Sequence, residues 1–216
     1  LSRKCSMKLY SFFRSGTSHR TRIVLNLKGL AYEAAYISLA KNEHHQAAFK
    51  ALNPQGFVPV LETESGNLLQ SPAIIEWLEE QYPEPTLLPT DTLGREKVRA
   101  IAALVGCDVH PLNNKRVLEY LRQNLGLDDA QINAWCAKWI QDGFAALEHI
   151  LEQDQSREKF CYGKQPTIAD AYLVPQVVSA ERFKVDLSAY PNINEIYQHC
   201  MTLEAFQKAA PEQQAD

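Results

Sequence analysis

The stretch FFRSGTSHRTRIVLNLKG, Phe12–Gly29, contains the turn between a predicted strand and a predicted helix. Lys8–Phe13 is rich in aromatic residues, as strands are, and the residues after Ser18 repeat apolar side chains at helical spacing until Gly29. A helix start exposes backbone N–H groups and the positive end of the helix dipole, so it attracts anions. The hydroxyls of this turn therefore have two interpretations: ordinary helix caps, or groups that stabilise a thiolate or an alkoxide.

The segments that follow alternate between strand and helix patterns. In order, they are a strand at Tyr32–Leu39, a short helix at His44–Leu52, strands at Val58–Thr63 and around Leu68–Gln70, and a helix at Ser71–Tyr82. Ser71 is expected to cap the last helix, with Pro72 at its first position. The order βαβ, a short helix, then ββα predicts a small mixed sheet covered by helices.

The second half of the chain is predicted to be all-helical. Three prolines mark Pro83–Thr92 as a linker. We expect an α/β N-terminal domain at 7–88, a linker at 83–94, and an all-α domain at 95–216. The predicted helices of this half are Arg95–Asn124, Asp128–Asp154, Thr167–Phe183 and Asn192–Leu203. Residues 1–6 precede Met7, and we expect them to be a vector-derived remnant.

Composition excludes several classes of function. The chain has 216 residues, 45% of them hydrophobic and 22% charged, with a net charge of −4, which suits a soluble globular protein better than one that binds nucleic acid or a membrane. No apolar run reaches membrane-spanning length. The five cysteines are scattered without a Cys-x-x-Cys, so neither a disulfide framework nor a metal site is predicted, and a cytoplasmic location fits.

Two further motifs point toward a ligand. Val58-Pro59 lies in a strand pattern, where proline indicates either an edge strand or a cis peptide that turns the Val58 backbone toward a peptide-like ligand. Gln70-Ser71 ends a strand and opens a helix, so Ser71 is either a cap or a group that binds a ligand carboxylate.

These motifs, in this order, resemble the thioredoxin-like domain of cytosolic glutathione transferases. GKQPTIADAYLVP at Gly163–Pro175 strengthens the resemblance, because Thr167–Asp170 forms the family's capping box. The resemblance covers nearly the whole chain from Met7. It implies a glutathione-transferase fold, glutathione as cofactor and a homodimer.

The zeta class is the most similar branch of that family. Both FFRSGTSHRTRIVLNLKG and QSPAIIEWLEEQYPEPTLLP resemble it, but this chain has Ser15–His19 as Ser-Gly-Thr-Ser-His where eukaryotic members have Ser-Ser-Cys-Ser-Trp. The motif at Ser15–His19, together with the segment Gly106–Arg122, resembles that of bacterial maleylpyruvate isomerases. The implied reaction is glutathione-dependent cis–trans isomerisation of maleylpyruvate or maleylacetoacetate, in which the thiolate adds, the new single bond rotates, and the thiol leaves.

A hydroxyl at the first turn suffices for this chemistry. Lowering a thiol pKa from about 8.5 by about 2 units, worth about 2.7 kcal/mol, makes the thiol mostly ionised at neutral pH. A hydroxyl hydrogen bond to a charged group supplies about 1.5–3 kcal/mol, and a helix N-terminus adds about 0.3–1 kcal/mol. The resemblance makes Ser15 the first candidate for this role and Thr17 the second.

The remaining candidates are assigned by the resemblance. Cations held locally in an acidic protein would bind the two carboxylates of the substrate, and the alternative interpretation of each cation is a solvated surface charge. His110 and Asn114, four residues apart, are expected on one side of a long helix. The candidate substrate-binding residues are Arg14, Arg116 and Arg182, with Arg14 also counted as catalytic, and the candidate glutathione-binding residues are His44, Gln55, Val58, Gln70, Ser71, His110 and Asn114.

Two other functions fit the same residues. A glutathione transferase acting on small haloacids would begin with the same thiolate attack and differ in losing a leaving group. A non-catalytic scaffold would keep Val58-Pro59 and Thr167–Asp170 for the fold, with less reason to keep Ser15 and Gln70-Ser71. The sequence does not separate maleylpyruvate from maleylacetoacetate, because a difference of one methylene is worth only about 1–3 kcal/mol.

Overall fold

The computed structural model describes residues 7–215, so the predicted vector remnant at 1–6 lies outside the described residues. The chain divides into two compact units. The first consists of the chain up to Thr86 together with the segment from Thr202 onward, and the second is Leu87–Met201. Within residues 7–215, no helix combines the length and the apolar character that a bilayer crossing requires.

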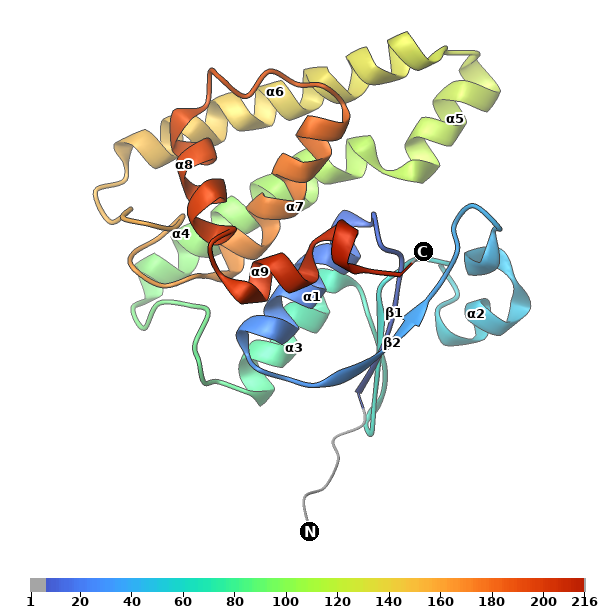
Figure 1. Ribbon diagram of the computed structural model, residues 1–216, viewed down its shortest axis with the longest axis horizontal. Coiled ribbons are helices and arrows are strands. Elements are labelled where there is room, and N and C mark those ends of the chain that lie inside the picture. The colour runs from blue at the N-terminus through green and yellow to red at the C-terminus, as the bar shows by residue number, and fades with distance from the viewer. Residues whose placement is uncertain (1–6, 216) are drawn as a thin grey trace. The chain divides into compact units, whose positions relative to one another are not determined.

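A four-stranded mixed sheet forms the centre of the first unit (Figure 1). Its order is β2-β1-β3-β4, with β1 parallel to β2 and antiparallel to β3. Strand β1 alternates buried and less buried residues, as a strand with one face on the core does, and its buried Leu9 pairs with Ala34 of β2 and Leu61 of β3. The strands are β1 Met7–Ser11, β2 Tyr32–Tyr36, β3 Val60–Thr63 and β4 Gly66–Leu69. The predicted order of strands and helices is confirmed.

Helices α1 and α3 pack against each other and cover the sheet with buried apolar side chains. The helical segments of this part are α1 Gly16–Leu27, the 3₁₀ turn η1 Glu43–His45, α2 Ala47–Leu52 and α3 Ser71–Gln81. The prediction that Ser71 caps α3 is wrong. Gln70 occupies the cap position without a side-chain bond, and Ser71 is already the first helical residue, with Pro72 in the first turn.

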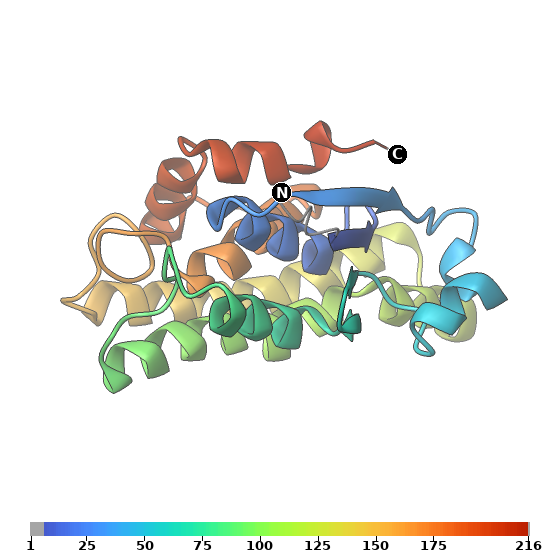
Figure 2. The same cartoon turned by 90° about the horizontal axis from the view of Figure 1, so that it is seen from below.

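The C-terminal segment belongs to the first unit. Helix α9, Glu204–Ala209, packs along α1, and the two lie side by side in Figures 1 and 2, followed by the turn η4, Pro211–Gln213. Asn26 of α1 donates from Nδ2 to the Ala205 carbonyl at 2.9 Å. The division therefore differs from the predicted domain at 95–216, because contacts with α1 draw the last residues back to the sheet domain.

The second unit is helical as predicted, but its first long helix is interrupted. Its elements are α4 Thr92–Ala103, the π-helical turn η2 Leu104–Val109, the 3₁₀ turn η3 His110–Asn113, α5 Lys115–Leu125, α6 Asp129–Gln153, α7 Ile168–Arg182 and α8 Pro191–Cys200. The prediction of one helix at Arg95–Asn124 is wrong, because Pro111 lacks the N–H of a continuing helix and Asn114 opens a new one. Helix α4 begins inside the predicted linker, where Asp91 Oδ1 accepts the Gly94 N–H at 2.7 Å.

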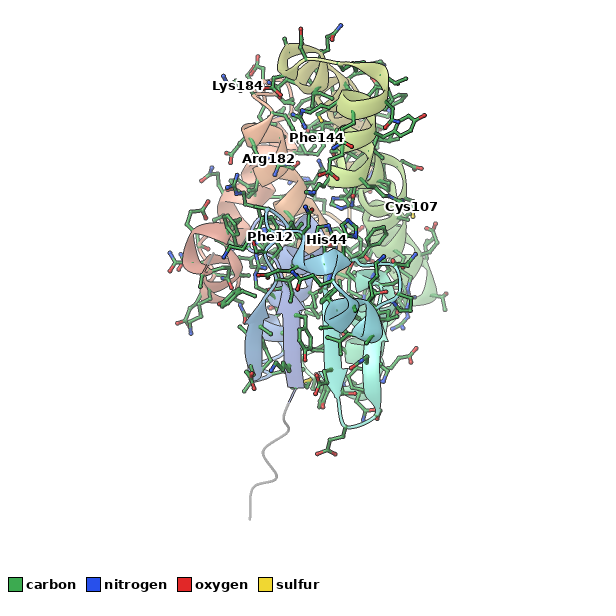
Figure 3. All side chains as sticks on the ribbon, turned by 90° about the vertical axis from the view of Figure 1, so that its right-hand side faces the viewer. Phe12, His44, Cys107, Phe144, Arg182 and Lys184 are labelled. Atoms are coloured by element: carbon green, nitrogen blue, oxygen red, sulfur yellow. The ribbon has the colours of Figure 1, made fainter. Side chains whose placement is uncertain are left out.

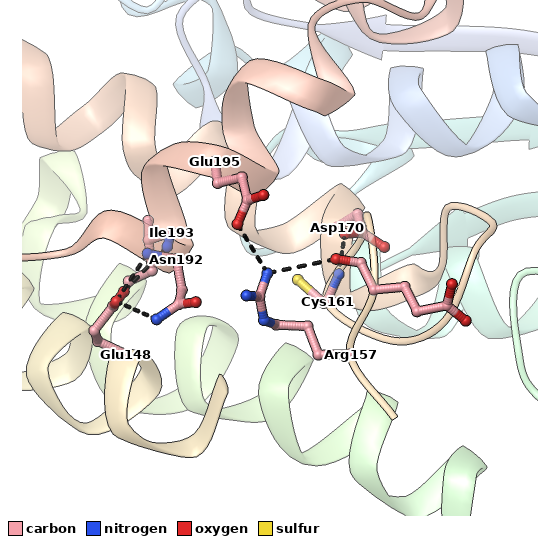
Figure 4. A network of polar contacts seen from close by, with 8 residues as sticks. Glu148, Arg157, Cys161, Asp170, Asn192, Ile193 and Glu195 are labelled. Atoms are coloured by element: carbon pink, nitrogen blue, oxygen red, sulfur yellow. Dashed lines mark hydrogen bonds and ion pairs between the residues drawn. The ribbon is translucent and has the colours of Figure 1, made fainter. Parts of the chain in front are cut away.

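Helix α7 is buried along most of its length and begins with the predicted capping box, which is confirmed. Asp170 accepts the Thr167 N–H at 2.7 Å and, through its other oxygen, the Cys161 N–H at 2.8 Å (Figure 4). In the same view Glu148 of α6 accepts the Asn192 N–H at 2.8 Å, at the start of α8. A buried carboxylate, Asp170, and a partly buried one, Glu148, thus accept backbone N–H groups and fix the starts of two helices in this unit.

Lys28 binds the C-terminal end of α3 and the residues that follow it. Its buried ammonium lies 2.7 Å from Glu79 Oε2 and donates to the carbonyls of Tyr82 at 2.6 Å and Pro85 at 3.0 Å. Both charged side chains are almost inaccessible, with 0% and 8% exposed. The ammonium therefore satisfies one carboxylate and two carbonyls where the chain leaves α3.

We expect Lys28→Met to destabilise the protein by about 3–5 kcal/mol, because it leaves the Glu79 carboxylate buried without its lysine. The measurement is urea denaturation followed by circular dichroism. Lys8→Met is the matched control: the Lys8–Glu33 pair spans a similar 2.8 Å but lies at the surface, so its loss should cost far less stability than the loss of Lys28. Equal losses in both variants would contradict this account of the buried pair.

Candidate active site

The turn into α1 is built by its own hydroxyls. Ser15 occupies the N-cap position in an extended conformation, and its Oγ accepts the Ser18 N–H at 3.2 Å. The Ser18 hydroxyl in turn accepts the Phe12 N–H at 3.4 Å, and the Ser15 N–H donates to the Phe12 carbonyl at 3.1 Å. The hydroxyls therefore do cap the helix, and the hydrogen bonds that they accept hold the turn in one conformation.

A chain of hydrogen bonds runs from Ser15 through Thr17 to Val58. Thr17 Oγ1 lies 2.9 Å from the Val58 carbonyl oxygen and 2.8 Å from Ser15 Oγ. A carbonyl only accepts, so the single hydroxyl proton of Thr17 is directed at Val58. Ser15 must then donate its own proton to Thr17. The Ser15 proton is the one that can turn to a new acceptor without breaking the bond between α1 and the Val58 segment.

The loop before β3 brings Val58 into position. The Val58-Pro59 peptide is cis, as one of the two interpretations predicted. Asn53, which is buried, organises the preceding residues: its Oδ1 accepts the Gln55 N–H at 3.1 Å, and its Nδ2 donates to the Phe57 carbonyl at 2.8 Å. In the sequence, Asn53 only marks the end of the short helix predicted at His44–Leu52. Its place before a proline, typical of side-chain-stabilised turns, was the signal for this second role.

The start of α3 presents a second candidate anion site. Gln70 has φ of 66°, a positive value that is uncommon and costly for a residue with a side chain. Its amide Nε2 donates to Gln55 Oε1 at 2.5 Å, so these two predicted residues are brought together. Ser71 is buried at the first position of the helix, and the positive dipole end favours a carboxylate there.

His44 lies beside the same loop. It is buried in η1, its ring centroid is 3.9 Å from that of His45, and Figure 3 labels it together with Phe12 of the first turn. Gly56 has φ of 69°, and a Cβ added there would lie 2.8 Å from the His44 carbonyl oxygen. A glycine at 56 is therefore required for the loop that leads to Val58 to pass the His44 backbone.

Arg14 supplies an exposed cation next to Ser15. Its guanidinium lies over the Phe13 ring, 4.8 Å from the centroid, and the Phe13 ring packs edge-on against Phe12. The aromatic pair supports the arginine by a cation–π contact while its donors stay accessible. A local positive charge thus stands at the turn of an acidic protein.

The remaining candidates lie in the second unit. Arg182 ends α7 with its guanidinium 4.5 Å from the Phe183 centroid, and Figure 3 labels it on that helix. Arg116 is exposed in the first turn of α5, where Asn114 Oδ1 accepts its N–H at 3.2 Å. His110 lies in the 3₁₀ turn before that helix. The expectation that His110 and Asn114 share one helical face is wrong, because the helix is broken between them. Their roles toward a ligand stay predictions.

The buried thiols are held in the protonated state. Burial raises the pKa of Cys136 to about 11, and burial also raises the pKa values of Cys161 and Cys200, with Asp170 adding to the rise in both. A protonated thiol is a poor nucleophile. These three buried cysteines therefore serve packing rather than nucleophilic chemistry. Within residues 7–215, no group of three or more His, Cys, Asp or Glu side chains is arranged to hold a metal ion.

Family models and solved structures give a consistent result. The N-terminal domain of glutathione S-transferases matches residues 14–81, and their C-terminal domain matches residues 140–204. A maleylpyruvate isomerase from a Ralstonia species is 60% identical over 210 residues, covering 97% of this chain and 99% of that protein.

Two solved structures extend the comparison. The holo structure of a maleylpyruvate isomerase, a bacterial glutathione S-transferase of the zeta class, has a TM-score of 0.96 and 59% identity, covering 97% of this chain and 99% of that one. The maleylacetoacetate isomerase of Methylobacterium extorquens AM1, solved with malonate and glutathione, has a TM-score of 0.93 and 36% identity, covering 96% of this chain and 98% of that one.

His19 gives the first turn of α1 a pH-dependent stability. Burial, with the nearby Arg22 charge, lowers the pKa of His19 from 6.5 to about 3, so the folded protein binds fewer protons than the unfolded chain between these values. Stability should therefore fall with pH below 6.5, by about 1.4 kcal/mol per unit. Between about pH 7 and about pH 5, we expect wild type to lose about 2 kcal/mol more than His19→Gln.

Urea denaturation at the two pH values measures this difference. The control is His149→Gln, which replaces an exposed histidine and should keep the wild-type loss. If His19→Gln loses as much stability on acidification as wild type does, His19 is not the group that titrates on unfolding.

Proposed function

Because this chain belongs to the zeta class of the glutathione S-transferase family, we propose that it is a glutathione-dependent cis–trans isomerase of a maleyl-diketo acid. Maleylpyruvate and maleylacetoacetate are the candidate substrates. The observation that carries the proposal is the Ser15–Thr17–Val58 chain of hydrogen bonds, which leaves one hydroxyl proton free to turn toward a thiolate. The isomerase names of the similar proteins support it.

Glutathione is proposed to bind along the first unit. The Val58 backbone N–H would pair with the peptide-like backbone of glutathione. Ser71 and the start of α3 would bind a carboxylate of glutathione, with Gln70 and Gln55 beside it. His44 is proposed for the other carboxylate, and His110 and Asn114 stay further candidates for glutathione binding. The glutathione present in the Methylobacterium extorquens structure supports this use of the fold.

The proposed chemistry leaves glutathione unchanged. The glutathione thiolate adds to one carbon of the cis double bond, and the electron pair moves into the adjacent carbonyl as an enolate. The new single bond rotates, the enolate reforms the double bond as trans, and the thiolate leaves. Ser15 would donate its hydrogen bond to the thiolate, giving up only a neutral bond to Thr17. Thr17 then stays bound to Val58 and holds the turn.

The substrate is proposed to be held by cations. Arg14 stands next to Ser15 and would bind a substrate carboxylate, while Arg116 and Arg182 are further candidates for that role. Malonate bound to the Methylobacterium extorquens relative is also a dicarboxylate, which supports a diacid as substrate. A homodimer, which the family resemblance implies, and a cytoplasmic location, which the scattered cysteines favour, complete the proposal.

We expect Ser15→Ala to lower kcat/KM about 10- to 100-fold, because a hydrogen bond to the thiolate worth about 1.5–3 kcal/mol is lost. The pKa of bound glutathione, read from ultraviolet thiolate absorbance, should rise by about 1–2 units. Thr17→Val removes the hydrogen bonds that join Thr17 to Ser15 and Val58 but leaves the Ser15 hydroxyl in place, so kcat/KM should fall less than in Ser15→Ala. Thr17→Ser is the control that keeps the hydroxyl. If Thr17→Val abolishes the thiolate while Ser15→Ala keeps it, the assignment is reversed.

We expect Arg14→Ala to raise KM for the diacid about tenfold or more while the affinity for glutathione changes little, because a charge-assisted bond to a substrate carboxylate is lost. Rates are measured with maleylpyruvate and maleylacetoacetate, each generated in situ, with and without glutathione. Release of halide from haloacids without isomerisation would favour the haloacid transferase instead. A folded protein that binds glutathione and turns over neither class of substrate would contradict the isomerase proposal.

A further inference from the structure

A buried arginine joins the first turn to the end of the chain. Arg22, in the middle of α1, is 1% exposed. Its Nε donates to the carbonyl of Ala209, the last residue of α9, at 2.9 Å, and its Nη2 donates to the carbonyl of Phe13 at 3.0 Å. One planar guanidinium therefore bridges two backbone segments that are far apart in the sequence.

Each end of this bridge carries a defined part of the first unit. Phe13 directly precedes Arg14 and Ser15, and its ring supports the Arg14 guanidinium at 4.8 Å. Ala209 is buried where α9 ends against α1. A shift of the Phe13 carbonyl would move the residues on both sides of the thiolate site, since Ser15 also hydrogen-bonds to the Phe12 carbonyl at 3.1 Å.

The arginine is costly at this place if it only fills space. Burial lowers its pKa from 12.5 to about 10, so it remains charged at neutral pH, and the ionisable groups that raise it again are the phenols of Tyr32 and Tyr36 rather than carboxylates. The other ionisable group that it faces is His19 on the same helix. Its Nη1 has no hydrogen-bond partner among the described residues. An apolar side chain would pack there without this cost but could not donate hydrogen bonds. What the arginine adds is therefore its two hydrogen bonds to backbone carbonyls.

We infer that Arg22 is a positioning residue, which fixes the Phe13–Ser15 turn against the C-terminal helix α9 and so sets the direction of the Ser15 hydroxyl. This inference rests on the proposed function of Ser15. The residues 202–215 thereby take part in the reaction without touching glutathione or substrate. Neither Arg22 nor α9 was singled out by the sequence, because the contact joins positions 187 residues apart.

Asn26 offers a matched control on the same helix. It lies one turn beyond Arg22 and donates to the Ala205 carbonyl of α9 at 2.9 Å, so it helps to hold α9 in place. It makes no bond to the turn that carries Ser15. Loss of Asn26 therefore tests the anchoring of α9 alone, while loss of Arg22 tests that anchoring together with the turn.

The experiment compares Arg22→Met, Arg22→Lys and Asn26→Ala in the full chain. Lysine keeps the positive charge but cannot bridge both carbonyls as the guanidinium fork does. Thermal unfolding reports stability, ultraviolet absorbance reports the pKa of bound glutathione, and steady-state kinetics report kcat and KM separately. We expect both Arg22 variants to raise that thiol pKa by about one unit and to lower kcat about tenfold. Asn26→Ala should lower the unfolding temperature. It should leave the thiol pKa at the wild-type value and kcat within about twofold of wild type.

Three results would overturn the inference. The first is a folded Arg22→Lys with the wild-type thiol pKa and kcat, and this variant decides the matter if Arg22→Met does not fold. The second is an Asn26→Ala variant whose thiol pKa and kcat change as much as those of the Arg22 variants, since anchoring of α9 in general would then be responsible. The third is the absence of a thiolate signal in wild type with glutathione, which would refute the proposed function itself and is recognised before any variant is compared.

Discussion

The hydrogen bond from Thr17 to the Val58 carbonyl is the contact on which the site depends. It joins the start of α1 to the loop before β3, two segments 41 residues apart in the sequence. By using the Thr17 proton, it also fixes the direction of the next hydroxyl, so Ser15 becomes the donor of the pair. One bond thus sets both the geometry of the turn and the assignment of the movable proton.

The loop and helix around this bond are shaped by backbone requirements. Asn53 holds the residues before Val58, Gly56 lets that loop pass His44, and Gln70 adopts a positive φ at the start of α3. The positive φ of Gln70 is costly for a residue with a side chain, and strain of this kind clusters at sites where a ligand meets the backbone. Hydrogen-bond donors that are held in place before a ligand arrives reduce the reorganisation that binding requires.

The order of strands and helices was predictable from local pattern, because apolar periodicity and the residues Gly29, Pro72 and Thr167 mark where the elements lie. The interruption at Pro111 was missed because the residues around it keep helical composition, and only the backbone shows the π and 3₁₀ turns. The return of α9 was missed for a different reason: Arg22 and Asn26 look like surface residues of a helix until their distant partners are known.

The candidate site, like the fold, was predictable where local pattern marks it and not where distant contacts decide it. Ser15, Thr17, Gln70 and Ser71 stand at element boundaries, which sequence patterns reveal, and Gln55 was found only through the family resemblance. The direction of the Ser15 proton depends on a carbonyl 41 residues away from Thr17 and has no local signal. Asn53 was visible as a residue but not as an organiser of the loop.

Thr17 stands where eukaryotic zeta-class members have the motif cysteine, and the geometry gives this replacement a physical reason. A thiol is a weak hydrogen-bond donor, whereas the threonine hydroxyl donates a full bond to Val58 and accepts one from Ser15. The chain keeps its buried cysteines protonated within the second unit, and it obtains its reactive sulfur from glutathione. A hydroxyl at this position is neither a strong nucleophile nor a site of oxidation at neutral pH, whereas an accessible cysteine is open to both reactions.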